Sequence, residues 1–284
     1  MRVGVPRDYF FDAPELDEEV RAAVLGAIEA MGRAGARIVE VAIPRATAGQ
    51  AACTVTIRSE SYGYHERDLR DRPELYGRHT RRALTIGALF TAADFVQAQR
   101  VRSIVKAETA AALAGADVLV VPTMLSPAAE FEGYDPDGRL ANPSYTGIWN
   151  MTGSPALSVP CGFSRAGLPI GMQIVGRPFD EATVLRVGDA YQRLTDWHTR
   201  APRPGAGDRV SGVGDVERFA SSATPPEPAA AAAVEAILER SRLRPDDEER
   251  ARLARVYPTL RAQADALRLV DLGPREPALI FPAR

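Results

Sequence analysis

Residues 150–180 read NMTGSPALSVPCGFSRAGLPIGMQIVGRPFD. This stretch contains two short apolar runs, Ala156–Val159 and Ile170–Val175, each bounded by glycine and proline, which do not continue a regular element. The first run is too short for a helix, and the second is rich in β-branched residues. The pattern therefore predicts two buried strands joined by a loop of about ten residues.

A helix is predicted to begin directly after these strands, with Asp180 as its N-cap. Apolar side chains recur at helical spacing through the next turns, at Val184, Val187, Tyr191 and Leu194. The order strand, loop, strand, helix is typical of the inner part of an α/β domain.

The beginning of the chain has the pattern of a βαβ unit. A short strand at 3–6 is followed by a helix that opens with Asp17 and two acidic residues, and then by an alternating strand at 37–43. The two strands of such a unit lie parallel. Further along, residues 95–112 have the most regular helical periodicity, and residues 117–123 form an apolar run typical of a central strand covered on both faces.

The wording of these segments resembles the amidase-signature enzymes, a family that includes bacterial amidases, carboxybiuret hydrolases and the A subunit of the glutamyl-tRNA amidotransferase. The family typically reads N-x-x-G-x-P-A-x-S-V-P-x-G, then L-P-x-G-x-Q-x-x-G, then phenylalanine and aspartate at a helix start. This chain departs from the pattern at Ser154. The resemblance covers about residues 1 to 200 and implies the C-terminal half of the family's fold, a mixed β-sheet sandwiched by helices.

The resemblance also implies substrate-binding residues. In the tRNA amidotransferase branch an arginine near the position of Arg82 binds the substrate carboxylate, a task that suits its planar fork. An aspartate at the position of Asp180 contacts the substrate amino group, a helix that carries Tyr62 and Tyr64 passes over the pocket, and Asn150 opens the family motif. The alternatives remain open: a solvated charge for Arg82, a simple N-cap for Asp180, and an exposed helix surface for the tyrosines.

The catalytic groups of the family are not found in this chain. Its members hydrolyse amides with a serine, a second serine in a cis peptide and a lysine, carried by a loop rich in glycine and serine. No such loop occurs here: Ser221 and Ser222 lack flanking glycines, and the only lysine, Lys106, lies within a predicted helix. Cys161 is more simply a small buried residue than a nucleophile. We therefore predict no catalytic residue in this chain.

The chain divides into three regions by composition. Residues 1–201 form the amidase-like portion, residues 202–228 are a linker rich in glycine, proline and serine, and residues 229–284 form a helical tail. Pro258 is expected to kink or break the second tail helix. A tail this short needs another surface to pack on. With Glu276–Phe281, it resembles the small belt subunit of some amidase-signature enzymes; an unrelated helical extension is the alternative.

Composition and charge argue against a nucleic-acid-binding, membrane, secreted or metal-binding protein. The chain is 45% hydrophobic and 25% charged, with a net charge of −2, so it has no electrostatic footprint for nucleic acid. It has no apolar run long enough for a membrane span and no secretory signal, and its two cysteines fit a reducing compartment, so a cytoplasmic location is expected. Three scattered histidines and two cysteines give no metal-ligand spacing. We expect neither metal nor cofactor.

These observations predict the C-terminal part of a hydrolase that acts on carbon–nitrogen bonds of a small amide and is inactive alone. Its expected partners are the amide and either the missing N-terminal catalytic half or a second copy of the chain. The alternatives are a non-catalytic subunit that completes the pocket of a split amidase, and a truncated pseudo-enzyme.

Overall fold

The computed structural model describes residues 1–129, 144–201 and 225–272. Most of the predicted linker at 202–228 and the segment Glu276–Phe281 lie outside the described residues. In the part of the chain that is described, no helix is long and apolar enough to cross a membrane.

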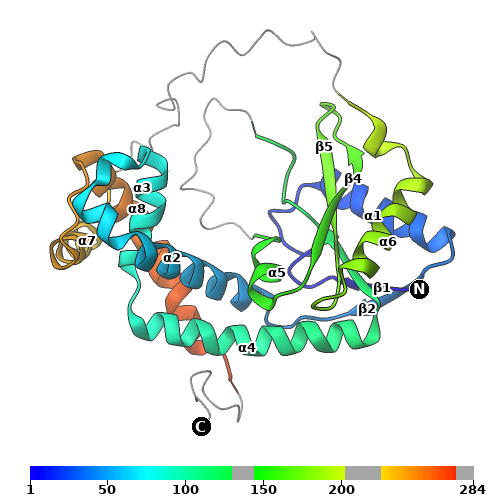
Figure 1. Ribbon diagram of the computed structural model, residues 1–284, viewed down its shortest axis with the longest axis horizontal. Coiled ribbons are helices and arrows are strands. Elements are labelled where there is room, and N and C mark those ends of the chain that lie inside the picture. The colour runs from blue at the N-terminus through cyan, green and yellow to red at the C-terminus, as the bar shows by residue number, and fades with distance from the viewer. Residues whose placement is uncertain (130–143, 202–224, 273–284) are drawn as a thin grey trace. The chain divides into compact units, whose positions relative to one another are not determined.

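The described residues form two compact units, whose elements are labelled in Figure 1. The boundaries fall inside two helices, between Thr47 and Ala48 and between Ile104 and Val105. Unit 1 contains residues 1–47, 105–129 and 144–201, and unit 2 contains residues 48–104 and 225–272. Contacts thus place the helical tail in the same unit as residues 48–104.

A five-stranded mixed sheet forms the core of unit 1, in the order β2-β1-β3-β5-β4. Strand β1 pairs in parallel with β2 and β3, which confirms the predicted βαβ unit, whereas β5 is antiparallel to both β3 and β4. The strands are Arg2–Pro6 (β1), Arg37–Val41 (β2), Val118–Pro122 (β3), Ala156–Phe163 (β4) and Pro169–Val175 (β5).

The centre of the sheet confirms the prediction from the apolar run, because every residue of β3 is buried. The predicted end of the first strand at Val159 is wrong. Strand β4 continues through Pro160 to Phe163, with an irregularity in register between Pro160 and Gly162, and the loop before β5 is correspondingly short. An end strand with a bulge tolerates proline, because one side of its backbone has no pairing strand to lose.

Helices α1 (Glu18–Arg33) and α6 (Glu181–Leu194) pack against β4 and β5. Asp17 is the N-cap of α1, and its carboxylate accepts a hydrogen bond from the backbone of Glu19. Gly188 lets α6 approach the sheet closely, since a Cβ there would lie 2.5 Å from Leu157. The prediction that Leu194 belongs to the apolar face of α6 is wrong, because this side chain is exposed in the last turn of the helix.

Unit 2 consists of helices. The tail contributes α7 and α8, as predicted, and residues 48–104 contribute most of the others. The elements are Ala46–Asp71 (α2), Pro73–Leu75 (η1), Arg78–Thr85 (α3), Ile86–Leu89 (η2), Ala92–Gly115 (α4), Pro228–Ser241 (α7), Asp247–Ala266 (α8) and Leu267–Leu269 (η6). The short helices α5 (Gly147–Thr152) and η4 (Trp197–Thr199) belong to unit 1.

Of the predicted kink or break at Pro258, the break is wrong, because α8 runs through this residue as one helix. Leu253 and Leu260, on either side of the proline, are both buried, so packing holds the two segments together despite the lost hydrogen bond. Asp246 and Glu249 form a capping box at the start of α8.

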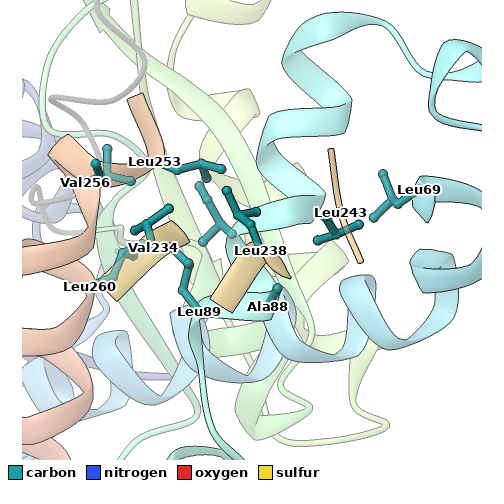
Figure 2. Close-up of a cluster of buried hydrophobic side chains, with 11 residues drawn as sticks. Leu69, Ala88, Leu89, Val234, Leu238, Leu243, Leu253, Val256 and Leu260 are labelled. Atoms are coloured by element: carbon teal, nitrogen blue, oxygen red, sulfur yellow. The ribbon is translucent and has the colours of Figure 1, made fainter. Parts of the chain in front are cut away.

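A buried apolar cluster joins the tail to the rest of unit 2 (Figure 2). The prediction that the tail needs another surface to pack on is confirmed, because the cluster contains side chains from residues 69–89 and from the tail. Its members are Leu69, Ile86, Ala88, Leu89, Val234, Leu238, Leu243, Leu253, Ala254, Val256 and Leu260. Among the described residues, the tail therefore shares one apolar cluster with α2 and η2.

A buried carboxylate forms a second junction in unit 2. Asp94 is 0% exposed and accepts hydrogen bonds from Arg261 (Nη1 to Oδ2, 2.6 Å) and Arg268 (Nη2 to Oδ1, 2.6 Å) of the tail. It also accepts from the backbone and hydroxyl of Thr91 at the start of α4. Burial alone raises the pKa of Asp94, but the hydrogen bonds from Arg261, Thr91 and Arg268 outweigh it and hold the pKa well below its usual range.

Leu253→Ala tests the shared core. Leu253 is fully buried in the cluster, so the variant should lose about 2–5 kcal/mol of unfolding free energy, through lost transfer energy and a residual cavity. Urea unfolding measures this loss. Leu269→Ala is the matched control, since Leu269 is 87% exposed and should change stability by no more than about 0.5 kcal/mol. Equal losses in the two variants would contradict the shared core.

Asp94→Asn tests the buried carboxylate. Removing its charge leaves two arginines without their buried partner, so we expect a loss of about 3–5 kcal/mol at neutral pH. Because the pKa of Asp94 is lower in the folded protein than in the unfolded chain, its contribution to stability is fully present above about pH 4 and is lost as pH falls below it. The unfolding free energy of the variant should therefore fall less steeply with decreasing pH.

Asp265→Asn is the control for this variant. Asp265 accepts from the same two arginines but is largely exposed, so its loss should stay below about 1 kcal/mol. A loss from Asp94→Asn as small as that of the control would contradict the assigned role.

Candidate functional site

The predicted substrate-binding residues are divided between the two units. Asn150 and Asp180 lie in unit 1, and Tyr62 and Arg82 lie in unit 2. Each pair is described within its own unit.

Asn150 lies on the exposed side of α5, whose other side is anchored in an aromatic cluster. Trp149 is buried and stacks on Phe10 with ring centroids 5.3 Å apart, and Tyr145 packs against the same ring. Helix α5 ends at Gly153, which has a left-handed conformation (φ 76°) that glycine adopts without strain. The buried rings therefore fix the short helix and leave the Asn150 side chain facing outward.

Asp180 stands directly before α6, but its side chain makes no hydrogen bond to the backbone of the helix. The predicted position as N-cap is confirmed, and the expected capping bond is wrong: Oδ1 instead accepts from the hydroxyl of Thr183 at 2.7 Å. The carboxylate is half-buried. The preceding Phe179 has a left-handed backbone conformation (φ 65°), which is energetically unfavourable for any residue other than glycine. Its side chain is 96% exposed.

The segments that carry Asn150 and Asp180 meet at one end of the sheet. The backbone N–H of Gly176, after β5, donates to the carbonyl of Pro155, before β4, at 2.9 Å. Gly176 is packed so tightly that a Cβ there would lie 2.5 Å from Val184. The turn that follows α5 and the turn that precedes α6 are thus joined by a backbone hydrogen bond.

Arg81 and Arg82 have different environments on α3. Arg81 donates from Nε (2.9 Å) and Nη2 (2.6 Å) to Oε1 of Glu249 in the tail. Arg82 is only 6% exposed, so the alternative of a solvated charge is wrong. Arg81 is thus held by a carboxylate, and Arg82, predicted from the family resemblance to bind a substrate carboxylate, is buried.

Tyr62 of α2 lies against the apolar cluster of unit 2, with its hydroxyl donating to Glu66 at 3.4 Å. Burial raises its pKa. The neighbouring backbone is close: a Cβ on Gly87 would lie 2.4 Å from the Tyr62 Cβ and 2.1 Å from the Arg58 carbonyl oxygen. Tyr64, in contrast, points to solvent as an exposed surface residue.

The other side chains weighed as nucleophiles or bases have the following surroundings. Burial raises the pKa of Cys161 to about 12, so its thiol stays protonated at neutral pH, as expected for a small core residue. Lys106 is exposed on α4. His65 hydrogen-bonds the hydroxyl of Tyr76 at 2.9 Å. Among the described residues, no group of histidine, cysteine, aspartate and glutamate side chains could hold a metal ion.

Glu249 and Asp94 were not predicted to link the tail with residues 48–104, although both are buried and pair with arginines across that junction. The spacing Asp246-x-x-Glu249 is a capping-box signal and could have been recognised. The partner of Glu249 could not, because Arg81 lies 168 positions away in the chain.

Comparisons with known proteins agree with these observations. A family model described as Amidase matches residues 1–185. An amidase of Pseudomonas putida is 42% identical over 211 residues, covering 71% of this chain and 44% of that protein. The A subunit of the glutamyl-tRNA(Gln) amidotransferase of Chloroflexus aggregans (strain MD-66 / DSM 9485) is 37% identical over 229 residues, covering 71% of this chain and 46% of that protein.

Solved structures give the same result. A crystal structure of an amidase superposes with a TM-score of 0.59 at 28% identity, covering 68% of this chain and 45% of that one. The chain thus spans less than half the length of the relatives it matches, and the family match at 1–185 ends before the tail helices begin.

Proposed function

Because the chain belongs to the amidase family, we propose that it forms the substrate-side portion of a hydrolase that cleaves carbon–nitrogen bonds of small amides. The observation that carries this proposal is the family match over 1–185, together with the environments of Arg82 and Asp180 in the regions it covers. The catalytic serines and lysine that the family resemblance implies would come from another segment.

The chemistry of the chain's own residues supports the proposal that substrate binding and catalysis are carried by different segments. Amide hydrolysis needs a nucleophile that attacks the carbonyl carbon, donors for the oxyanion, and a proton for the departing amine. Cys161 is protonated and buried, and Lys106 is exposed within a regular helix rather than desolvated. Residues 1–284 alone are therefore proposed not to hydrolyse amides.

Binding is the role that these residues suit. A buried arginine such as Arg82 pairs a carboxylate strongly, because the guanidinium fork can donate two parallel hydrogen bonds away from competing water. The half-buried carboxylate of Asp180 can accept hydrogen bonds from an ammonium group. The proposed substrates are accordingly small amides, with Arg82 favouring those that carry a carboxylate.

The surface of unit 1 supports a second segment as partner. Within the described residues β4 ends the sheet, so one side of its backbone lacks a pairing strand, and exposed strand edges favour addition of another strand. Phe179, which follows β5 in the chain, is almost fully exposed. One relative is named as the A subunit of an amidotransferase, which implies a protein of more than one subunit and is in line with a partnered state.

Ammonia release tests the proposal. The purified 284-residue chain should release none from glutamine, an aliphatic amide or a biuret-type compound. Co-produced with the portion of the Pseudomonas putida amidase that it does not match, it should give turnover. Replacing the nucleophilic serine of that portion by alanine should abolish the activity. Turnover by the chain alone, lost on changing one of its own residues, would contradict the proposal.

Arg82→Lys tests the carboxylate role in the co-produced enzyme. Lysine keeps the charge but loses the bidentate fork, so KM for glutamine should rise by about tenfold while KM for an uncharged aliphatic amide changes little. Steady-state kinetics measure both constants. Arg78→Lys on the same helix is the control, since Arg78 is exposed and pairs with Glu248. An equal rise for both substrates would refute carboxylate recognition by Arg82.

A further inference from the structure

The tail helices lie beyond the residues that match the amidase family, yet they contact the helix that carries Arg82. The family match ends at residue 185, and α7 and α8 span 228–266. Arg78 donates to Glu248 at 3.0 Å, and Arg81 donates twice to Glu249. The first turn of α8 is therefore ion-paired with the polar side of α3.

Helix α3 is too short to hold its own orientation. It has eight residues, and isolated helices of that length are unstable in water. Helix α2 anchors it from one direction, where Arg58 donates to the Ala83 carbonyl at 3.0 Å and Gly87 packs against the α2 backbone. The tail supplies the other anchor, through Arg81, which directly precedes Arg82.

Glu249 is buried within this contact, and both of its carboxylate oxygens are hydrogen-bonded. It is 2% exposed, and a buried carboxylate is costly unless it is paired. One oxygen accepts both bonds from Arg81, and the other accepts from the backbone N–H of Asp246 at 3.3 Å. The Asp246 carboxylate in turn accepts from the Glu249 backbone at 2.8 Å. The capping box of α8 thus presents a fixed, desolvated charge to Arg81.

We propose that Glu249 is a positioning residue for substrate recognition: it fixes Arg81, and with it α3, so that Arg82 is held ready for a substrate carboxylate. The tail is then a built-in support of the binding residue. This inference rests on the function proposed above, because that function assigns Arg82 to the carboxylate.

The first experiment measures the solvent accessibility of Arg82 on α3 in the 284-residue chain and requires no enzymatic activity. Phenylglyoxal modifies accessible guanidinium groups, and peptide mass spectrometry follows Arg82 alone. Wild-type Arg82 should be protected by burial, and Glu249→Ala should raise its modification rate by about fivefold. Glu235→Ala is the matched control, because Glu235 pairs with Arg250 inside the tail and with no residue of α3.

Glu249→Gln guards against a variant that does not fold. Glutamine keeps the size and the capping hydrogen bonds but not the charge, so circular dichroism should be unchanged and Arg82 should become about twofold more reactive. An Arg82 rate in both Glu249 variants equal to that in the Glu235 control overturns the inference, whatever the catalytic result.

The second experiment measures function in the co-produced enzyme. Glu249→Ala should raise KM for glutamine by about fivefold, with kcat and the KM of an aliphatic amide within about twofold. A purely structural role would change both substrates alike, and that result overturns the inference. Absence of turnover in the wild-type pair counts against the proposed function, and the Arg82 modification rate still decides the positioning role.

Discussion

The structure of unit 2 depends on one constraint: the tail and residues 48–104 have to bury the same apolar cluster. Leu238, Leu253 and Leu260 of the tail are almost completely inaccessible to solvent, and Leu69 and Leu89 meet them from the other side. Burial of each such side chain contributes about 1.5–3 kcal/mol. The two tail helices bury their apolar faces together with α2 and η2, so each set of helices provides buried surface for the other.

Electrostatics makes this apolar junction specific. Asp94 and Glu249 are both buried, and each is neutralised by arginines from the opposite side of the junction: Asp94 by the tail, and Glu249 by Arg81 of α3. A shifted register of the tail would leave one of these carboxylates buried without its partner, at a cost of several kcal/mol.

Local patterns predicted most of the fold. The apolar run at 117–123 predicted the central strand, the two runs after Ser154 predicted the β4–β5 pair, and helical periodicity located α1, α4, α6, α7 and α8. The errors arose where tertiary contacts outweigh local preference. Strand β4 passes through Pro160 because no other described strand pairs with its outer side, and α8 passes through Pro258 because buried leucines flank it.

The candidate site residues remain predictions from the family resemblance, and their contacts could not be predicted from the sequence. Arg82 and Asp180 followed from resemblance, whereas the Arg81–Glu249 pair joins positions far apart in the chain, and no spacing rule reveals it. Asp180 has the residue type and position of an N-cap, yet its carboxylate bonds the Thr183 hydroxyl, because side-chain geometry depends on the φ and ψ of the turn. The carboxylate of Asp180 is consequently not committed to the helix backbone.

Native-state hydrogen exchange across a denaturant series tests most directly whether the tail and α3 form one cooperative core. If they do, amides of α3 and of α8 around Leu253 and Leu260 should share a single opening free energy and respond alike to denaturant. Exchange of α8 through a separate opening of low free energy, while α3 remains protected, would contradict the account.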